Sequence, residues 1–334
     1  MNRSPNVAIV GATGAVGLTL LSLLETRHFP LNSLHLLASP KSAGTQIKFR
    51  SNALNVKSLD AFSFRDIDLA FFAADNDIAK QFAPIAAAQG TIVIDKSSAF
   101  RLDSNVPLVI PEINAEVLTT HQGIIASPNC TTTIMLMAIA PLYKKKQIRR
   151  IIASTYQAAS GAGIQAIREL KEESLAFLEN RPYARSVFPQ PYAFNVFAHN
   201  SKLYDNGYVD EELKILEESR KILGDASLRI SATCVRVPTL RSHAETLNIE
   251  FSEPFSVEEA YDTLCKAPGL LKWEERVSGK FATPLDAQGK DEVLFGRIRQ
   301  DLSHPNALEM WVVGDQILKG AALNAVQIAE YLIL

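Results

Sequence analysis

The chain has 334 residues, of which 47% are hydrophobic and 21% are charged, with a formal net charge of −2. This composition is typical of a globular protein, and the length favours two domains over one. A charge balance so close to zero argues against nucleic-acid or membrane-surface partners, because both require a basic face. We find no secretion signal and no apolar run of the ~18 residues that span a membrane, so no membrane partner is expected.

The cysteines and histidines form no metal-binding pattern. Cys130, Cys234 and Cys265 are widely spaced and make no CxxC pair, and the six histidines are scattered. An odd number of unpaired cysteines is typical of a reducing compartment. We therefore expect a cytoplasmic protein without a metal site.

The chain opens with a strand, a glycine turn and a helix. An apolar run at residues 7–10 predicts a buried strand, and an amphipathic helix runs on through Leu24. The turn between them, residues 11–17, allows close backbone approach, and the helix start can hold a pyrophosphate. Its spacing is GxxGxxG and not GxGxxG, so a purely structural turn is the alternative. The flanking strand and helix favour dinucleotide binding.

The next predicted strand, residues 34–38, bears on the choice of cofactor. A site for NAD usually has an acidic residue after this strand, which binds the ribose 2′-hydroxyl. This chain instead has Ser39, Lys41 and Ser42 there, and no acid. A lysine and two hydroxyls fit a 2′-phosphate, so NADP is expected over NAD. A solvated turn is the alternative.

Two further strands, at residues 68–74 and 91–95, flank a predicted helix at 78–89. The alternation of strands and helices predicts a Rossmann-like, doubly wound parallel sheet. Residues 96–101 leave the last strand at its carboxyl end, where such sheets bind ligands. Arg101 is a candidate anion ligand there, and a surface arginine is the alternative.

A turn at residues 126–133, Ala-Ser-Pro-Asn-Cys-Thr-Thr-Thr, contains Cys130 and is followed by an apolar run at 134–140. This pattern predicts a loop entering a helix, which the basic residues 144–146 end. A thiol at a helix N-terminus faces unpaired N–H groups that favour the nucleophilic thiolate. The alternative is an inert, small buried side chain.

The second half predicts an α+β domain with a mixed sheet. We expect strands at residues 150–157, 229–237, 243–251 and 308–313, helices at 168–177, 210–223 and 320–332, a glycine/serine turn at 158–163 and an ordered irregular loop at 181–200. The strands at 229–237 and 243–251 suggest an antiparallel pair. We expect a cofactor domain at 1–131, to which a helix within 317–334 returns, and a catalytic and dimerisation domain at 132–316.

Six stretches carry a resemblance that covers nearly the whole chain in order. They are residues 11–17, 97–101 (Ser-Ser-Ala-Phe-Arg), 128–131 (Pro-Asn-Cys-Thr), 154–163, 234–238 with 241–243, and 319–325. With them the chain resembles the bacterial-type aspartate-β-semialdehyde dehydrogenase family. It departs from that family's common residues at Lys96 (commonly Asn), Lys41 (commonly Arg) and Gln316 (expected as Asn).

The resemblance implies a homodimer that reduces L-aspartyl-4-phosphate with NADPH to L-aspartate-4-semialdehyde and phosphate. This reaction belongs to the pathway to lysine and diaminopimelate, threonine, methionine and isoleucine. The implied catalytic residues are Cys130 as the acyl-thioester nucleophile, His243 as acid/base and Gln157 as substrate-orienting amide. The implied substrate ligands are Arg236 for the α-carboxylate, Glu211 for the amine, and Arg101, Asn129 and Lys214 for phosphate. The implied cofactor contacts are Thr13, Gly14, Ala15, Val16, Ser160, Gly161 and Gln316. To these the glycine turn adds Gly11, and the loop after residues 34–38 adds Ser39, Lys41 and Ser42.

The chemistry is consistent with these residue types. A thiolate displaces phosphate from an acyl phosphate, and one histidine can serve as base and acid. Taken singly, His243 could equally be structural, and Glu211 with Lys214, three apart on a helix, could be a surface ion pair. Other functions remain open: an N-acetyl-glutamyl-phosphate reductase, or a nucleotide-binding scaffold without catalysis. A non-catalytic paralogue group lacks the cysteine that this chain retains.

Overall fold

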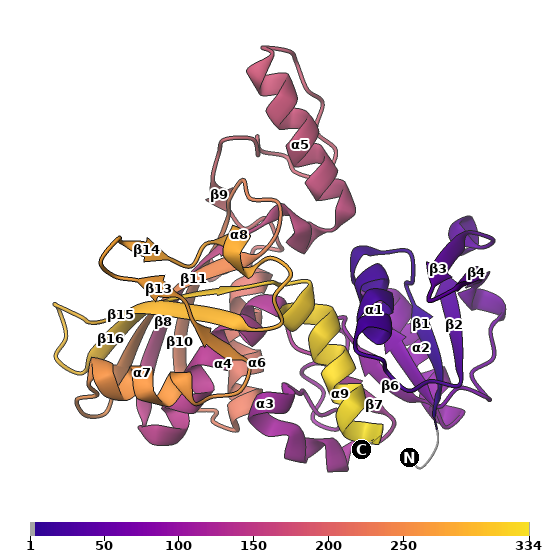
Figure 1. The fold of residues 1–334 in the computed structure, drawn as a ribbon, viewed down its shortest axis with the longest axis horizontal. Coiled ribbons are helices and arrows are strands. Elements are labelled where there is room, and N and C mark those ends of the chain that lie inside the picture. Colours follow the sequence, from indigo (N-terminus) through magenta and orange to yellow (C-terminus); the bar gives the residue numbers. More distant parts are fainter. Residues whose placement is uncertain (1–3, 334) are drawn as a thin grey trace. The chain divides into compact units, whose positions relative to one another are not determined.

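The structure of the protein is a computed structural model, and it describes residues 4–333. The chain divides into two compact units (Figure 1). The first contains the residues up to Asn129 and those from Ala321 onward, and the second runs from Cys130 to Gly320. Each unit has its own seven-stranded sheet.

The first unit is a parallel sheet with one antiparallel edge strand, in the order β3-β4-β2-β1-β5-β6-β7. The strands are β1 (Asn6–Val10), β2 (Ser33–Ala38), β3 (Gln46–Phe49), β4 (Asn52–Ser58), β5 (Leu69–Phe72), β6 (Ile92–Asp95) and β7 (Ile124–Ala126). The helices are α1 (Ala15–Thr26), α2 (Asn76–Ala88), α3 (Pro111–Asn114) and α9 (Leu323–Ile333). The prediction of a Rossmann-like parallel sheet is confirmed, whereas the β3–β4 hairpin was not anticipated.

The tight turn after β1 explains why glycine begins it. Gly11 has a φ of +81°, and a Cβ added there would lie 2.3 Å from the carbonyl oxygen of Ala73. Backbone N–H groups of Gly11 and Ala12 both donate to the carbonyl of Leu37 on β2. The turn therefore packs directly against the two neighbouring strands, and only a residue without a side chain allows this approach.

The second unit is a mixed sheet in the order β12-β15-β16-β11-β8-β10-β9, as the sequence predicted. Its strands are β8 (Ile148–Gln157), β9 (Phe197–Ala198), β10 (Arg229–Arg236), β11 (His243–Phe251), β12 (Leu270–Lys272), β15 (Val293–Gln300) and β16 (Ala307–Gly314). A separate small sheet contains β13 (Glu274–Glu275) and β14 (Lys280–Phe281). The helices are α4 (Cys130–Lys145), α5 (Ile164–Leu178), α6 (Asp210–Leu223), α7 (Val257–Cys265) and α8 (Pro284–Ala287).

The expected antiparallel pairing of β10 with β11 is wrong. β8 lies between them, with β10 parallel on one side and β11 antiparallel on the other. The segment joining β10 to β11 passes the end of β8, where the carbonyls of Thr239 and Leu240 accept from the N–H groups of Ala159 and Ser160. β8 is ten residues long, so it offers a complete hydrogen-bonding edge to each neighbour.

The irregular loop predicted at residues 181–200 is irregular except for β9. Its rings are nevertheless buried: Phe188 and Tyr192 pack against Phe197 and against Leu170 of α5. In the part of the chain from residue 4 to residue 333, no helix combines the length and the apolar character needed to cross a membrane.

Candidate active site

In the first unit, the glycine turn borders a cavity of about 340 Å³. Its lining includes Gly11, Thr13 and Gly14 from the turn, and Ser39 and Pro40 from the end of β2. Among the other predicted cofactor residues, Ala15 and Val16 begin α1, while Lys41 and Ser42 belong to the short 3-10 turn after β2. Two acids that we did not predict, Asp60 and Asp75, also line this cavity.

Arg101 is not a solvated surface arginine. It is 7% exposed, its Nε donates to the carbonyl of Ser127 at 3.0 Å, and its Nη2 donates to the carbonyl of Lys96 at 2.9 Å. Lys96 donates from Nζ to the carbonyl of Pro128 at 3.0 Å and to Ser127 Oγ at 3.3 Å. Lys96, where the resembling family commonly has Asn, thus supports the turn that precedes Asn129. Asn129 is itself buried.

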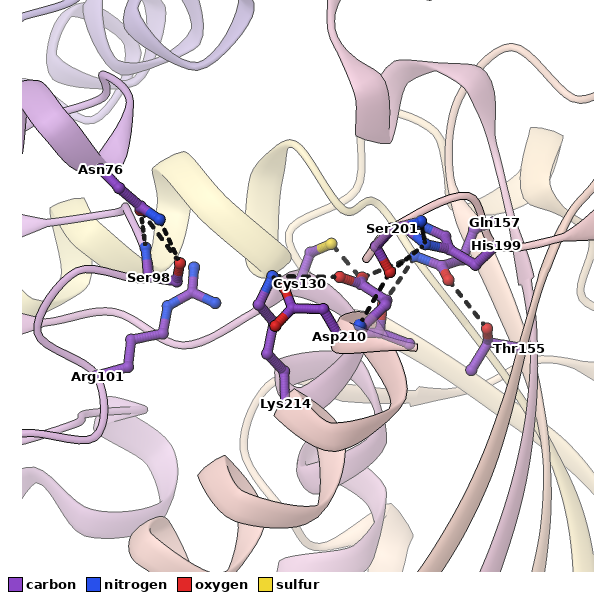
Figure 2. Close-up of polar contacts among 12 residues, drawn as sticks. Asn76, Ser98, Arg101, Cys130, Thr155, Gln157, His199, Ser201, Asp210 and Lys214 are labelled. Atoms are coloured by element: carbon purple, nitrogen blue, oxygen red, sulfur yellow. Dashed lines mark hydrogen bonds and ion pairs between the residues drawn. The ribbon is translucent and has the colours of Figure 1, made fainter. Parts of the chain in front are cut away.

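The carboxyl end of β6 is also ordered by side chains. Asp95 is buried and accepts from both the N–H and the hydroxyl of Ser97. Burial raises the pKa of Asp95, although the bonds from Ser97 oppose this. Asn76 of α2 accepts from the N–H of Ser98 and donates to its hydroxyl (Figure 2). The stretch that leads to Arg101 is therefore held in one conformation.

In the second unit, Cys130 is the first residue of α4, as predicted, and is partly buried. Its Sγ lies 3.9 Å from Thr131 Oγ1. Gly320 packs against it so closely that an added Cβ would lie 2.7 Å from the Cβ of Cys130. The thiol is thus placed at a helix N-terminus, where the helix dipole favours negative charge.

A hydrogen-bonded amide connects the end of β8 to α4 and α6. Gln157 Nε2 donates to Glu211 Oε1 at 3.0 Å and to Thr131 Oγ1 at 3.2 Å, and Gln157 Oε1 accepts from Thr155 Oγ1 at 3.2 Å (Figure 2). A carboxylate only accepts, so Glu211 determines which end of the amide carries the N–H groups. Two of the predicted site residues, Gln157 and Glu211, are therefore in direct contact.

Lys214 lies one turn along α6 from these groups. Its Nζ is 2.6 Å from Asp210 Oδ2 and 3.9 Å from Glu211 Oε2 (Figure 2). Glu211 and Lys214 share a helix face, as their spacing predicted. The closer partner is Asp210, a residue that the sequence analysis did not single out.

His243 and Arg236 are buried side by side. The His243 Nδ1 accepts from the backbone N–H of Ala158 at 3.0 Å, so the neutral ring carries its proton on Nε2. That Nε2 has no hydrogen-bond partner among residues 4–333. Burial, and then the positive charge of Arg236, lower the pKa of His243 to about 3. Arg236 is 5% exposed; its Nη1 donates to the carbonyl of Ala158 at 3.3 Å, and its Nε has no partner in the described part of the chain.

The glycine/serine turn at residues 158–163 closes around these two side chains. A Cβ on Gly161 would lie 3.1 Å from both Arg236 Nη1 and His243 Nε2. Gln316 donates to the Ser160 hydroxyl and accepts from the N–H of Ser242. Three predicted cofactor residues, Ser160, Gly161 and Gln316, therefore lie together beside His243.

A second buried histidine, His199, was not predicted from the sequence. His199 Nδ1 lies 3.1 Å from the Ser201 hydroxyl, which accepts from the backbone N–H of Glu211 at 3.1 Å (Figure 2). Burial, and then Arg236, lower the pKa of His199 to about 4. Its only signal in the sequence was a position within an aromatic-rich loop.

Two residues before the Gln157–Arg236 pair, Thr155 of β8 lies opposite Cys234 of β10 on one side and Glu245 of β11 on the other. Glu245 is fully buried, and within residues 4–333 neither of its carboxyl oxygens has a hydrogen-bond partner. Burial raises the pKa of Glu245 well above its usual range, and burial likewise raises the pKa of the Cys234 thiol. We infer that both groups are neutral. Among residues 4–333, no group of three or more His, Cys, Asp or Glu side chains is arranged to hold a metal ion.

Comparison with known proteins identifies the family. Residues 6–121 match the semialdehyde dehydrogenase NAD-binding domain, and residues 139–319 match the semialdehyde dehydrogenase dimerisation domain. The chain is 51% identical to aspartate-semialdehyde dehydrogenase from Synechocystis sp. over 327 residues, covering 98% of this chain and 97% of that protein. The chain belongs to the aspartate-semialdehyde dehydrogenase family.

The relationship extends to other bacteria and to solved structures. Identity to the Bacillus subtilis aspartate-semialdehyde dehydrogenase is 42% over 340 residues, covering 99% of this chain and 98% of that protein. The crystal structure of aspartate semialdehyde dehydrogenase II from Vibrio cholerae complexed with ASA has a TM-score of 0.96 and 42% identity, covering 99% of this chain and 98% of that chain. The predicted fold and family are confirmed.

Proposed function

We propose that this protein is an aspartate-semialdehyde dehydrogenase that uses NADPH to convert L-aspartyl-4-phosphate into L-aspartate-4-semialdehyde and phosphate. The supporting observation is Cys130 at the start of α4, next to the Thr131–Gln157–Glu211 network, in a chain 51% identical to a relative of that name. We also propose that this reaction is a step in the pathway to lysine and diaminopimelate, threonine, methionine and isoleucine.

In the proposed reaction the Cys130 thiolate attacks the acyl carbon and the phosphate leaves, so that a thioester links substrate and enzyme. The Gln157 amide, whose orientation Glu211 and Thr155 determine, is placed to hold the substrate beside this bond. Reduction of the thioester carbon gives a tetrahedral oxyanion, which collapses, releases the aldehyde and returns the thiolate. Backbone N–H groups at the α4 start would stabilise the oxyanion, an effect often worth about 3 kcal/mol.

We propose His243 as the acid/base of this reaction. Because Nδ1 accepts from Ala158, the neutral ring presents Nε2–H and can donate a hydrogen bond to a developing oxyanion. Proton uptake from Cys130 would require the other tautomer, and therefore an opening of the bond from Ala158. The pKa of His243, about 3, implies that the resting histidine is neutral at physiological pH.

The substrate's charged groups are assigned to buried partners. Arg236, with an unpartnered Nε, would bind the α-carboxylate, and Glu211 would bind the amine. Arg101, Asn129 and Lys214 are proposed for the phosphate; for Lys214 this means exchanging the Asp210 carboxylate for the ligand. Guanidinium groups suit both anions because they form paired, charged hydrogen bonds.

The cavity at the glycine turn fits a dinucleotide. Gly11 lets the turn pack against the backbone of Ala73, and α1 begins at Ala15, so that a helix N-terminus lies at this turn, a favourable position for a pyrophosphate. When bound, NADPH supplies the hydride. Ser39 borders this cavity, and Lys41 follows it by two residues; together with Ser42 they support our preference for NADP over NAD. Ser160, Gly161 and Gln316 are proposed as further cofactor contacts.

We further propose that residues 1–131 with 317–334 form the cofactor domain and that 132–316 form the catalytic and dimerisation domain of a homodimer. The two compact units and the matched dimerisation domain support this division. All three cysteines are free thiols, which supports the expectation of a cytoplasmic location.

The decisive experiment is a spectrophotometric assay in the oxidative direction, which supplies semialdehyde, phosphate and oxidised cofactor. We expect rapid phosphate-dependent reduction of NADP with aspartate semialdehyde and much slower reaction with N-acetyl-glutamate semialdehyde. Faster turnover of the acetylated compound would instead support the related reductase, and no turnover of either would leave a non-catalytic scaffold. Replacing NADP by NAD in the same assay measures the cofactor preference.

A further inference from the structure

Helix α5 buries two carboxylates in its apolar stripe. Its buried residues are Ala166, Glu169, Leu170, Glu173 and Ala176, spaced as one face of a helix. Glu169 is 3% exposed and Glu173 is 5% exposed. Because burying a carboxylate is costly unless it is well hydrogen-bonded, two glutamates on this face need an explanation.

Glu169 is surrounded by donors from the segment that follows α5. Its Oε2 accepts from the N–H groups of Ser186 at 2.5 Å and Val187 at 2.8 Å, and its Oε1 accepts from the N–H of Phe188 at 3.0 Å. The Ser186 hydroxyl adds a fourth bond. Burial alone would raise the pKa of Glu169, but these hydrogen bonds outweigh it and lower the pKa.

Glu173, one turn further along, holds the next part of the same segment. Its Oε2 accepts from the N–H groups of Tyr192 at 2.8 Å and Ala193 at 3.0 Å, and its Oε1 pairs with Arg185 Nε at 2.8 Å. Residues 185–193 contain no helix or strand. Their conformation therefore depends on five backbone N–H groups bound to two carboxylates.

This segment reaches the candidate active site through two rings. Phe188 and Tyr192 pack edge to face at 4.9 Å, and the Phe188 ring centre lies 5.8 Å from the Arg236 guanidinium carbon. The Tyr192 hydroxyl donates to the backbone carbonyl of Gln157 at 3.5 Å. Among residues 4–333, the Arg236 guanidinium makes one hydrogen bond, to the Ala158 carbonyl, so its contact with the Phe188 ring is a further restraint on its position.

We propose that Glu169 and Glu173 are positioning residues of the active site, which act through the segment 185–193 to hold Arg236 in its substrate-binding orientation. The inference rests on the proposed function, in which Arg236 binds the substrate α-carboxylate. In Figure 1, α5 extends away from the mixed sheet of its unit. Their effect is transmitted by packing.

Three isosteric variants test this inference: Glu169→Gln, Glu173→Gln and the control Glu172→Gln. Both oxygens of Glu169 accept backbone N–H groups. In Glu169→Gln the amide NH₂ must therefore face a backbone N–H, and two donors cannot form a hydrogen bond with each other. Glu173 can keep its backbone bonds through one oxygen and lose only Arg185. Glu172 lies on the exposed side of α5 and accepts only from the Tyr183 hydroxyl.

We expect Glu169→Gln to raise the KM for aspartate semialdehyde by roughly tenfold or more, with kcat changed by less than about threefold. Glu173→Gln should raise KM less, and Glu172→Gln should leave both constants unchanged. A lowered Tm with unchanged KM in both buried variants would show a merely structural role and overturn the proposal. Should Glu169→Gln fail to fold, Glu173→Gln carries the test.

A double-mutant cycle and a chemical probe identify the route. In an Arg236→Lys background, Glu169→Gln should raise KM by clearly less than in the wild type, whereas an equal rise would overturn transmission through Arg236. Phenylglyoxal labelling, mapped by mass spectrometry, should modify Arg236 faster in Glu169→Gln than in Glu172→Gln or the wild type. Labelling needs no turnover, so an inactive wild type would refute the proposed function alone, and equal labelling rates would refute this inference.

Discussion

The glycine turn of the first unit and the cysteine site of the second unit are built in opposite ways. The turn is one continuous stretch whose geometry depends on missing side chains, since a Cβ on Gly11 would overlap the backbone at Ala73. The site around Cys130 depends on side chains that are present, and it draws Gln157, Glu211 and His243 from three further elements. One region is therefore sensitive to added atoms, and the other to lost partners.

The same contrast appears in their electrostatics. The glycine turn offers backbone N–H groups and a helix start, which attract an anion without any buried charge. The cysteine site instead contains two histidines, His243 and His199, whose pKa values are lowered first by burial and then by the buried guanidinium of Arg236. Cofactor binding can thus be achieved by shape, whereas the proposed chemistry requires a tuned set of charges.

The largest effect is expected from removing the nucleophile. Cys130→Ala should lower turnover by about 10⁴-fold or more, because no thioester can form. The fold should remain, since a partly buried cysteine at a helix start fills little core volume. Steady-state assays with circular dichroism check both statements. Cys265→Ala, at an exposed free cysteine, is the control and should keep full activity; activity above a few per cent in Cys130→Ala would contradict the mechanism.

Adding one methyl group to the glycine turn should be the next largest effect. Gly11→Ala should lower the free energy of unfolding by about 3 kcal/mol, from overlap with the Ala73 carbonyl plus a left-handed backbone. Gly44→Ala separates the two causes, because Gly44 has a φ of +87° but open space around its Cβ position. We expect Gly44→Ala to lower the free energy of unfolding by about 1 kcal/mol, as measured by urea unfolding. Equal losses would mean that crowding at Gly11 is unimportant.

A methyl group can also be placed behind the nucleophile. Gly320→Ala would bring its Cβ within 2.7 Å of the Cys130 Cβ, so the start of α4 must move. A displacement of this kind should lower kcat by about 10- to 100-fold. Iodoacetamide labelling of Cys130 in the same variant reports whether the thiol has moved. Unchanged kcat and an unchanged labelling rate would show that the start of α4 accommodates the added methyl group without moving the thiol.

The smallest effect concerns the row behind the site. Glu245 is protonated in the fold and its pKa is raised, so the unfolded chain loses this proton first as the pH rises. The neutral Glu245 therefore makes its full contribution to the free energy of unfolding when the pH is below the usual pKa of a carboxyl group. This contribution declines as the pH rises through that pKa and above it. Glu245→Gln removes this dependence and should be more stable than the wild type by about 1 kcal/mol at pH 8.

Urea unfolding at pH 5 and pH 8 tests this expectation. The stability difference between Glu245→Gln and the wild type should grow from the lower pH to the higher one. Glu250→Gln, on the same strand but partly exposed, is the matched control and should show no such change. A constant difference at both pH values would mean that Glu245 is not held protonated.

Local pattern was sufficient for several elements. The run of apolar residues before Gly11, and the Pro-Asn-Cys turn before an apolar helix, each predicted the structure that forms, because both depend on neighbouring residues alone. The shared face of Glu211 and Lys214 followed from helical spacing in the same way. Pattern did not predict Thr155 or His199, whose roles depend on which strands are neighbours.

The sequence by itself therefore determined the two kinds of sheet, the glycine turn, the cysteine at a helix start and, through resemblance, the family. Only the tertiary structure decided that β8 separates β10 from β11, that Gly320 abuts Cys130, and that the donors for Glu169 and Glu173 come from the segment 185–193. The physical reason is the sequence separation of the residues involved. Turns and helix starts are determined by residues a few positions apart. Strand order, burial and hydrogen-bond partners are set by contacts between distant segments, which form only when the chain packs.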